Sequence, residues 1–310
     1  MNKRSIREFL VHPIRIVLSY VAPKCLANIY YRHVTPSGKG INWKSPKDLN
    51  EIINYLKFYS DTSQWTLFAD KYRVREYVKS RVDEDILPTV YGVWTKAEDI
   101  DFDSLPNKFV LKTNHGSGTN LLVEDKRKLD RLKTVKIVNK WLSNKIGQET
   151  VEFHYLKIQP LVFAEEFLED ESVSSFSRSV IDYKFWVLDG KCQYVFVCAD
   201  RDENDHSSHP YFDIYDMQWN QHSEYMRNCK TPIKIKKPQG FENMVKYAEA
   251  LAYGHPQMRV DFYNINGKIY FGELTMTSQG GYMDYYTSNF LVKMGELTNI
   301  NTYINKQKNG

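Results

Sequence analysis

The sequence predicts an α+β fold in which antiparallel hairpins follow a helical N-terminal region. Helix-periodic sequence fills residues 45–82, and short runs rich in β-branched and aromatic residues take over after residue 107. The expected strands are 108–113, 121–124, 158–166, 181–189, 192–199, 258–265 and 269–275, interrupted by helices at 130–145 and 241–253. Because neighbouring runs are joined by short turns and do not alternate regularly with helices, we expect hairpins and no regular βαβ arrangement.

The composition is that of an ordinary folded protein. Of the 310 residues, 42% are hydrophobic and 26% are charged, which is enough apolar material for a large core. The net charge of +4, from 42 basic and 38 acidic residues, is too small to indicate a nucleic-acid partner. The cysteines form no CxxC pair and indicate free thiols in a reducing cytoplasm; they are Cys25, Cys192, Cys198 and Cys229.

Residues 1–44 form a basic, amphipathic N-terminal segment. Pro13 and Arg15 interrupt its apolar stretch, which argues against a signal peptide, and no apolar run reaches the roughly 18 residues of a membrane span. Two interpretations stay open for residues 1–32. They form a helix that packs on the body of the protein, or they lie on an anionic membrane, at its inner face, or on a partner.

The following region, residues 45–106, is expected to be helical. Ser45 and Pro46 match an N-cap and a first helical position, and apolar residues follow at helical spacing in SPKDLNEIINYLKFY. A second helix is expected over residues 66–82, TLFADKYRVREYVKSRV. These helices precede the first predicted sheet.

A glycine-rich turn follows the first predicted strand, in KFVLKTNHGSGTN at residues 108–120. A Walker-type loop needs its lysine after the glycines and a helix beyond them. Here Lys112 precedes Gly116 and Gly118, and the residues that follow favour a strand. The turn is therefore either a polar hairpin turn, or a flap whose backbone amides cover phosphate groups while Lys112 neutralises charge.

A second group of charged residues lies in the hairpin MRVDFYNINGKIYFGELT. If its loop has three residues, 266–268, then Asp261 lies opposite Glu273, and Arg259 lies opposite Thr275 on the same face. A two-residue turn would instead turn Glu273 to the other face. Opposed carboxylates suit a divalent cation such as Mg²⁺, and Arg259 would stabilise a transferring phosphoryl group. The other interpretation is an exposed strand face with solvated charges.

Between these two motifs lie LVFAEEFLEDE and IDYKFWVLDGK. The first ends in Glu165 and Glu166, which are placed to accept ribose hydroxyls beside an adenine. The second carries Lys184 among aromatic and apolar residues, where burial is costly without an anion. Lys184 therefore either points to an exposed face or is a second phosphate ligand.

Five segments in this order resemble the ATP-grasp superfamily, and more closely its TupA-like branch, which is associated with bacterial polysaccharide and teichuronopeptide synthesis. The resemblance covers residues 45–290, through DKYRVREYV, LPNKFVLKTNHGSG, AEEFLED, DYKFWVLDGK and MRVDFYNINGKIYFGELT. It implies a nucleotide held between two α+β subdomains with antiparallel sheets. Residues 107–165 would form the lid subdomain with its glycine-rich flap, and residues 166–310 would form the C-terminal subdomain with the magnesium site.

The resemblance also implies roles for individual residues toward ATP and Mg²⁺. Lys112 and Lys184 would contact phosphate oxygens, and Arg259 and Lys184 would be catalytic. The remaining nucleotide contacts are the flap residues His115, Gly116, Ser117 and Gly118, and the adenine and ribose site Glu165, Glu166, Phe167 and Leu168. The metal residues are Asp261, Glu273 and Thr275. Thr275 is a departure, because the family commonly has asparagine at this last position.

The activity that the resemblance implies is an ATP-dependent carboxylate-amine ligase that works through an acyl phosphate. The expected product is an amide between an amino acid and a uronic-acid sugar of a bacterial surface polysaccharide or capsule. Residues 277–289, TSQGGYMDYYTSN, are a candidate acceptor site or ordinary packing. Alternatives are a sugar kinase with the same nucleotide clamp and a non-catalytic glycan-binding module. A zinc site at His206 and His209 is disfavoured, since the segment looks like a polar loop.

Overall fold

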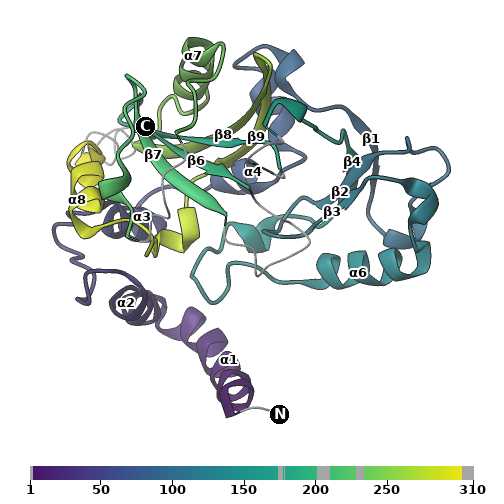
Figure 1. Ribbon diagram of the computed structural model, residues 1–310. Coiled ribbons are helices and arrows are strands. Elements are labelled where there is room, and N and C mark those ends of the chain that lie inside the picture. Colours follow the sequence, from purple (N-terminus) through teal and green to yellow (C-terminus); the bar gives the residue numbers. More distant parts are fainter. Residues whose placement is uncertain (1–2, 174–176, 178, 201–209, 228–233, 302–310) are drawn as a thin grey trace.

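The computed structural model contains two antiparallel sheets that form two lobes, each flanked by helices (Figure 1). It describes residues 3–173, 177, 179–200, 210–227 and 234–301. All pairings between the described strands are antiparallel, so the predicted α+β class with hairpins is confirmed.

The first lobe contains a four-stranded sheet in the order β1-β4-β2-β3. Its strands are β1 (Val90–Trp94), β2 (Phe109–Thr113), β3 (Asn120–Val123) and β4 (Val162–Glu165). Helix α6 (Arg131–Ser143) packs on it through Val138, which belongs to one apolar cluster with Phe109 and Leu111. Asp130 caps this helix by accepting a hydrogen bond from the backbone N–H of Lys133 at 2.9 Å.

Strand β1 lies within residues 45–106, where the sequence predicts only helices, and that expectation is wrong for this strand. Its five residues include Gly92, which weakens a strand in isolation. Pairing with β4 places it at the edge of the sheet, and the Trp94 ring covers the glycine, where a Cβ would lie 2.3 Å from the ring. Tertiary pairing therefore creates a strand that local preference does not indicate.

The second lobe contains a five-stranded sheet in the order β7-β6-β5-β8-β9. Its strands are β5 (Asp182–Leu188), β6 (Lys191–Ala199), β7 (Tyr211–Asp216), β8 (Gln257–Ile265) and β9 (Lys268–Thr275). Phe185 and Val187 of the central strand belong to one apolar cluster, whereas Trp186 and Leu188 belong to another. This alternation is expected for a strand buried on both faces. Strand β7 was absent from the sequence prediction.

Helices supply the other side chains of these two clusters. Helices α4 (Trp65–Ala69), α5 (Val74–Lys79) and α7 (Phe241–Leu251) contribute to the first cluster, α8 (Ser288–Glu296) contributes to the second, and α3 (Leu49–Tyr59) contributes to both. The predicted helices at 130–145 and 241–253 are thus confirmed as α6 and α7. Short 3-10 helices lie in the connections, at Glu84–Ile86, Ala97–Asp99, Lys126–Lys128, Tyr155–Lys157, Glu171–Val173, Ser223–Tyr225 and Ser278–Gly281.

The start of α3 differs from the sequence prediction. Its N-cap is Asp48, whose carboxylate accepts a hydrogen bond from the backbone N–H of Glu51 at 2.9 Å. The assignment of Ser45 and Pro46 to the first turn is wrong, because a carboxylate three residues later provides the cap and also suits the helix N-terminus electrostatically.

The predicted helix over residues 66–82 is also wrong, since it is broken into α4 and α5. The carboxylate of Asp70 accepts hydrogen bonds from the backbone N–H groups of Tyr72 at 3.0 Å and Arg73 at 2.9 Å. These local bonds replace helical ones at the break. Lys71 consequently lies in the turn between the two helices and belongs to neither of them.

The N-terminal segment forms helices α1 (Lys3–Val21) and α2 (Pro23–Val34), which extend from the lower side of the molecule in Figure 1. Helix α2 packs on the body through Ala27 and Tyr31, in a cluster with Ile41 and Tyr282. Within the described part of the chain, none of the helices has the length and apolar character needed to cross a bilayer.

Candidate active site

The β8-β9 hairpin brings the two predicted metal carboxylates together, although not through a three-residue loop. Its turn has two residues, Asn266 at φ 52° and Gly267 at φ 89°, as a tight hairpin turn of two left-handed residues requires. Of the two loop lengths that the sequence left open, the two-residue turn is therefore the correct one. A β-bulge at Gly272 restores the register, so that Asp261 still pairs with Glu273. A Cβ on Gly272 would lie 2.9 Å from the Asp261 carbonyl oxygen.

Arg259 is the centre of the polar network on this face of the sheet. Its guanidinium donates to both carboxylate oxygens of Asp261 at 2.8 Å, and its Nη2 donates to Glu273 Oε1 at 2.7 Å. It also donates to the hydroxyl oxygens of Thr275 and Ser278, each at 3.1 Å. The four residues of the predicted shared face thus do lie together, and the solvated-face interpretation does not apply to Arg259 and Asp261, which are 9% and 2% exposed.

Lys184 lies on the neighbouring strand β5, directly opposite Asp261 in the register. Its ammonium donates to Asp182 Oδ2 at 2.5 Å and to Asp261 Oδ2 at 2.6 Å. Lys184 is buried, so the exposed-face interpretation is wrong. Anions compensate its burial, as the cost of burying an ammonium demands.

The first lobe contributes Lys112, and a turn of the helices that pack on the second lobe contributes, unexpectedly, Lys71. Lys112 on β2 forms an ion pair with Glu165 at the end of β4. Lys71 occupies the turn between α4 and α5, where its ammonium donates to the Gly116 carbonyl oxygen at 2.6 Å and its backbone N–H donates to the Asn114 carbonyl oxygen at 2.9 Å. Lys71 therefore fastens the glycine-rich turn from outside the sheet.

Sequence reasoning missed Lys71 as a site residue. It lies in DKYRVREYV, one of the segments that carries the family resemblance, and that was the available signal. The expectation of a continuous helix concealed it, since a residue inside such a helix has no reason to meet a loop 45 positions later. Only the break after Asp70 frees its side chain.

The electrostatics place residues of both lobes around Lys71. Burial lowers the pKa of Lys71; Glu273 and Glu165 act against that shift, and the neighbouring cations Lys112 and Lys184 add to it. Burial tends to raise the pKa of Glu273, but Lys71, Arg259 and Lys184 overcome that effect and hold it at about 2. Three cations, Lys71, Arg259 and Lys184, therefore surround one carboxylate, Glu273.

The glycine-rich turn itself places only some of its predicted residues at the site. Gly116 and Ser117 line a cavity between the lobes. A Cβ on Gly116 would lie 2.5 Å from the Thr119 hydroxyl oxygen, so a close approach requires glycine here. Gly118 adopts φ +68°. His115 is buried beside the end of α6, and burial lowers its pKa.

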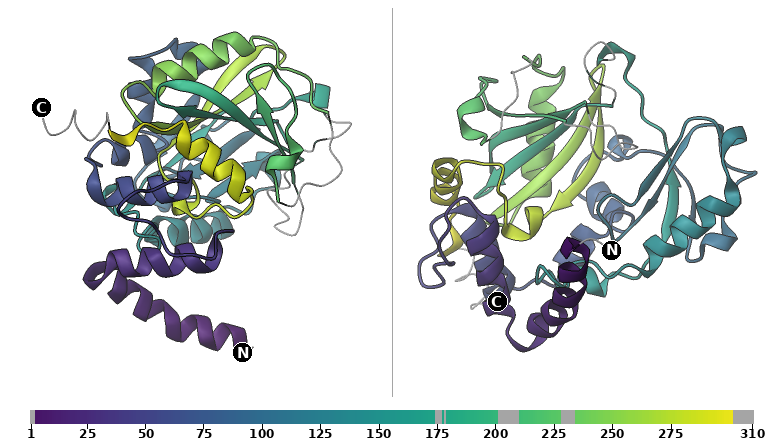
Figure 2. Two further views of the ribbon diagram at one scale, coloured as in Figure 1. Left: turned by 90° about the vertical axis from the view of Figure 1, so that its left-hand side faces the viewer. Right: turned by 60° about the horizontal axis from the view of Figure 1, so that its bottom comes forward.

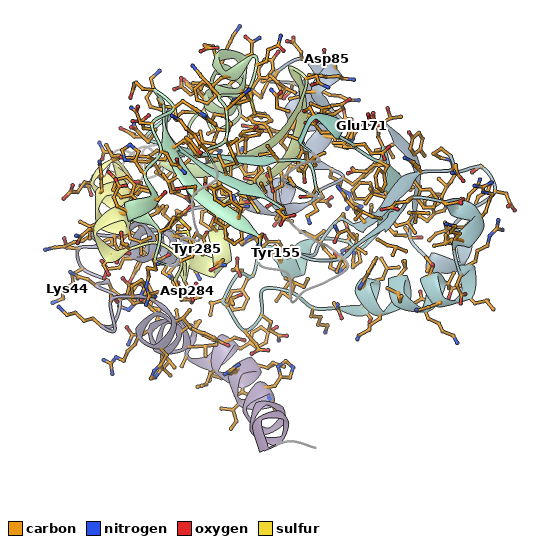
Figure 3. All side chains as sticks on the ribbon, viewed as in Figure 1. Lys44, Asp85, Tyr155, Glu171, Asp284 and Tyr285 are labelled. Atoms are coloured by element: carbon orange, nitrogen blue, oxygen red, sulfur yellow. The ribbon has the colours of Figure 1, made fainter. Side chains whose placement is uncertain are left out.

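The cavity between the lobes has a volume of about 540 Å³. Part of its lining suits phosphate and metal, namely Lys71, Gly116, Ser117, Arg259, Glu273 and Thr275. The lining also includes polar residues of three separate segments, His12, Gln148, Glu149 and Gln279. Tyr155, which also lines it, lies between the lobes in Figure 3. A cavity of this size accommodates a small organic ligand.

Other predicted residues lie outside this lining, as far as the structure describes it. They are Lys112, Lys184, Asp261, His115, Gly118 and the segment Glu165, Glu166, Phe167 and Leu168. Glu166 instead joins the segment to the start of β1, through hydrogen bonds with Thr89 at 2.8 and 3.0 Å. Of the candidate acceptor segment 277–289, Thr277, Gln279 and Gly280 line the cavity. His206 and His209 lie outside the described residues.

The oxygen atoms on the cavity wall fit a hard divalent cation better than a soft one. Glu273 and Thr275 present a carboxylate and a hydroxyl to the cavity. Both oxygens of Asp261 already accept hydrogen bonds from Arg259 and Lys184. Among the described residues, no group of three or more histidine, cysteine, aspartate or glutamate side chains could hold a metal ion. Glu273 and Thr275 alone would supply only part of the oxygen ligands that a Mg²⁺ ion needs.

Comparison with solved structures finds several ligases, all at low sequence identity. The chain is similar to the L-amino acid ligase from Bacillus licheniformis at a TM-score of 0.50 and 11% identity, over 82% of this chain and 55% of that one. A D-alanine-D-alanine ligase from Bacillus anthracis matches at a TM-score of 0.46 and 17% identity, over 78% and 69% of the two chains. The ATP-grasp ligase PsnB, complexed with a minimal precursor, Mg and ADP, matches at a TM-score of 0.39 and 12% identity, over 74% of this chain and 58% of that one.

The comparison with protein families is more specific. No curated protein sequence matches this chain. The model of the TupA-like ATP-grasp family matches residues 51–299, from within α3 to beyond α8, and so includes both sheets and every cavity-lining residue named above except His12. This chain belongs to the TupA-like ATP-grasp family.

Proposed function

We propose that this protein is an ATP-dependent carboxylate-amine ligase. One observation carries the proposal: a single cavity is lined by the glycine-rich turn of one lobe and by Arg259, Glu273 and Thr275 of the other. Cations and oxygen ligands that come from opposite sides suit a nucleoside triphosphate held against an acid. The ATP-grasp fold and family support the same assignment.

The residues around the cavity have distinct roles in this proposal. Lys71, Lys112 and Lys184 bind phosphate oxygens, and the backbone amides of Gly116 and Ser117 cover the phosphates from above. The segment Glu165–Leu168, with Glu166 and Phe167, lines the adenine and ribose at the connection between the lobes. His115 and Gly118 shape the turn without lining the cavity.

Glu273, Thr275 and Asp261 would hold Mg²⁺, which neutralises phosphate charge when it is bound. Glu273 and Thr275 face the cavity without rearrangement. Asp261 becomes a ligand only after Lys184 or Arg259 releases it. A phosphate that attracts the Lys184 ammonium would produce this release, so nucleotide binding and metal binding would be coupled.

The reaction follows from the charges that must be brought together. Arg259 and the lysines offset the repulsion between a substrate carboxylate and the γ-phosphate. The carboxylate oxygen attacks that phosphorus, ADP leaves, and an acyl phosphate results. An amine then attacks the acyl carbon, phosphate leaves, and an amide remains. The glycine-rich turn would close over the site and exclude water meanwhile.

The substrates we propose are a uronic-acid sugar as the carboxylate and an amino acid as the amine, in the cytoplasmic synthesis of a bacterial surface polysaccharide. The side chains of Gln148 and Gln279 in the cavity lining would offer hydrogen bonds to sugar hydroxyls. No other part of the site distinguishes one sugar from another.

The proposal is tested with purified protein, ATP, Mg²⁺ and a matrix of amino acids and uronic-acid sugars. ADP release identifies active pairs, and mass spectrometry identifies their products. A condensation product with free phosphate in equal amount to ADP is the expected result. ADP with a phosphorylated sugar and no free phosphate would show a sugar kinase instead. Absence of magnesium-dependent ATP binding would leave the glycan-binding alternative and overturn both enzymes.

A further inference from the structure

Helix α1 has an exposed apolar face. Ile14, Val17 and Val21 are 58%, 58% and 73% exposed, and their spacing of three and four residues places them on one side of the helix. The opposite side faces the protein, since Arg15 Nη1 donates to Glu149 Oε2 at 3.2 Å and its guanidinium lies 5.4 Å from the centre of the Tyr30 ring. The apolar face is thus not the face that packs on the body.

The segment that carries this face is strongly basic. Residues 1–44 contain eight lysines and arginines and a single acidic residue, Glu8, a net charge of +7. The whole chain has a net charge of only +4, so the remainder of the protein is acidic. Because the segment with a net positive charge also exposes apolar side chains, whereas the rest of the chain is net acidic, a negatively charged, apolar partner complements this segment.

We propose that α1 docks on an anionic lipid surface through Ile14, Val17 and Val21. An amphipathic helix lies in the plane of a membrane when its apolar face enters the boundary between headgroups and acyl chains and its basic residues meet anionic headgroups. The helix is well placed for this, since it extends away from both sheets in Figure 1. A protein partner would need an apolar patch beside an acidic one, whereas an anionic bilayer presents both in a single surface.

Docking in this orientation places the part of the cavity wall that α1 supplies near the lipid. His12 on α1 lines the cavity and contacts Glu149, and Tyr20 on the same helix accepts a hydrogen bond from Gln148 at 3.0 Å. Figure 2 shows α1 in front of the space between the two lobes. The acceptor of the reaction would then be carried by a membrane lipid. This last step, unlike the docking itself, rests on the proposed function.

Docking is measured by sedimentation of the full chain with vesicles. Vesicles of equal parts phosphatidylcholine and phosphatidylglycerol are compared with vesicles of phosphatidylcholine alone, at low and high salt. We expect partition onto the anionic vesicles only, weakened by salt. The double substitution Val17→Asp with Val21→Asp should weaken partition by at least about tenfold, because it removes two apolar side chains and adds two negative charges. The matched control is Leu132→Asp, at a residue of α6 that is 78% exposed and should leave partition unchanged.

Each other outcome overturns the docking proposal. Failure of the wild type to sediment with anionic vesicles does so, and so does equal partition of the double variant and the wild type. Dimerisation that depends on Val17 and Val21, without vesicle binding, would show that a second copy covers the face. Circular dichroism checks that the variants are folded. ADP release with water-soluble substrates, measured without vesicles, reports on the proposed function separately.

Discussion

Replacement of Lys112 by alanine should nearly abolish ADP formation and leave the protein folded. Lys112 forms an ion pair with Glu165, and their side chains are 25% and 10% exposed. Because the truncation leaves the Glu165 carboxylate without this cation in a partly buried position, we expect the free energy of unfolding to fall by about 1–2 kcal/mol, less than for a fully buried pair. Loss of a charged phosphate contact should lower kcat by about a hundredfold or more.

Urea unfolding gives the stability change and a coupled assay gives the rate of ADP release. The matched control is Lys191→Ala, which removes an exposed ion pair with Glu249 whose side chains are 71% and 26% exposed. This control should change the free energy of unfolding by no more than about 0.5 kcal/mol and leave ADP release unchanged. A folded Lys112→Ala variant that retains ADP release within about tenfold of the wild type would refute the phosphate role of Lys112.

Three further predictions concern the carboxylate cluster and its glycines. The pKa of Glu273 is lowered from 4.5 to about 2, so its ionised form stabilises the fold above pH 4.5 and this stabilisation is lost as the pH falls toward 2. Glu273→Gln should therefore reduce the acid-induced loss in free energy of unfolding by about 2 kcal/mol, after a discount for partial exposure; equal losses in both proteins would contradict this. Gly116→Ala should raise the KM for ATP by about tenfold, because its Cβ meets the Thr119 hydroxyl, and the additional change Thr119→Ala should recover part of the loss. Gly272→Ala should cost about 1–3 kcal/mol in urea unfolding, because its Cβ meets the Asp261 carbonyl oxygen; a stability equal to that of the wild type would show that the bulge does not need glycine.

The pairing of Asp261 with Glu273 shows how far sequence reasoning reaches in this protein. Strand parity correctly indicated that the two carboxylates need one extra residue between them in order to share a face. The extra residue is Gly272 in a bulge, and not a third residue in the loop. A loop and a bulge have the same effect on parity, so the pattern of side chains could not distinguish them. In the structure the bulge brings Gly272 so close to the Asp261 carbonyl oxygen that a Cβ at this position would lie 2.9 Å from it.

Lys184 shows a different limit. The sequence around Lys184 left two orientations of its side chain open. A strand residue points to one face of the sheet or the other, and aromatic neighbours occur on both faces. Burial between two helical layers removes the exposed option, and the carboxylates of Asp182 and Asp261 determine where the ammonium lies. Both partners are visible in the sequence, but only the β5-β8 pairing makes Asp261 a neighbour.

Local sequence patterns were sufficient to predict the antiparallel α+β class, most of the strands and helices α6 and α7. They were also sufficient to predict the family to which the chain belongs. Hydrophobic periodicity and turn residues carry that information over a few positions, where the backbone geometry is nearly invariant. Three features could be established only from three-dimensional packing. They are strand β1, the helix break that leaves Lys71 in a turn, and the cavity that α1 shares with the β8-β9 hairpin. Those features depend on contacts such as Lys71 with Gly116 and His12 with Glu149, which are 45 and 137 residues apart. Contacts between residues so far apart in the sequence leave no periodic signal in a single sequence. The residues around each partner are compatible with contacts to many other parts of the chain.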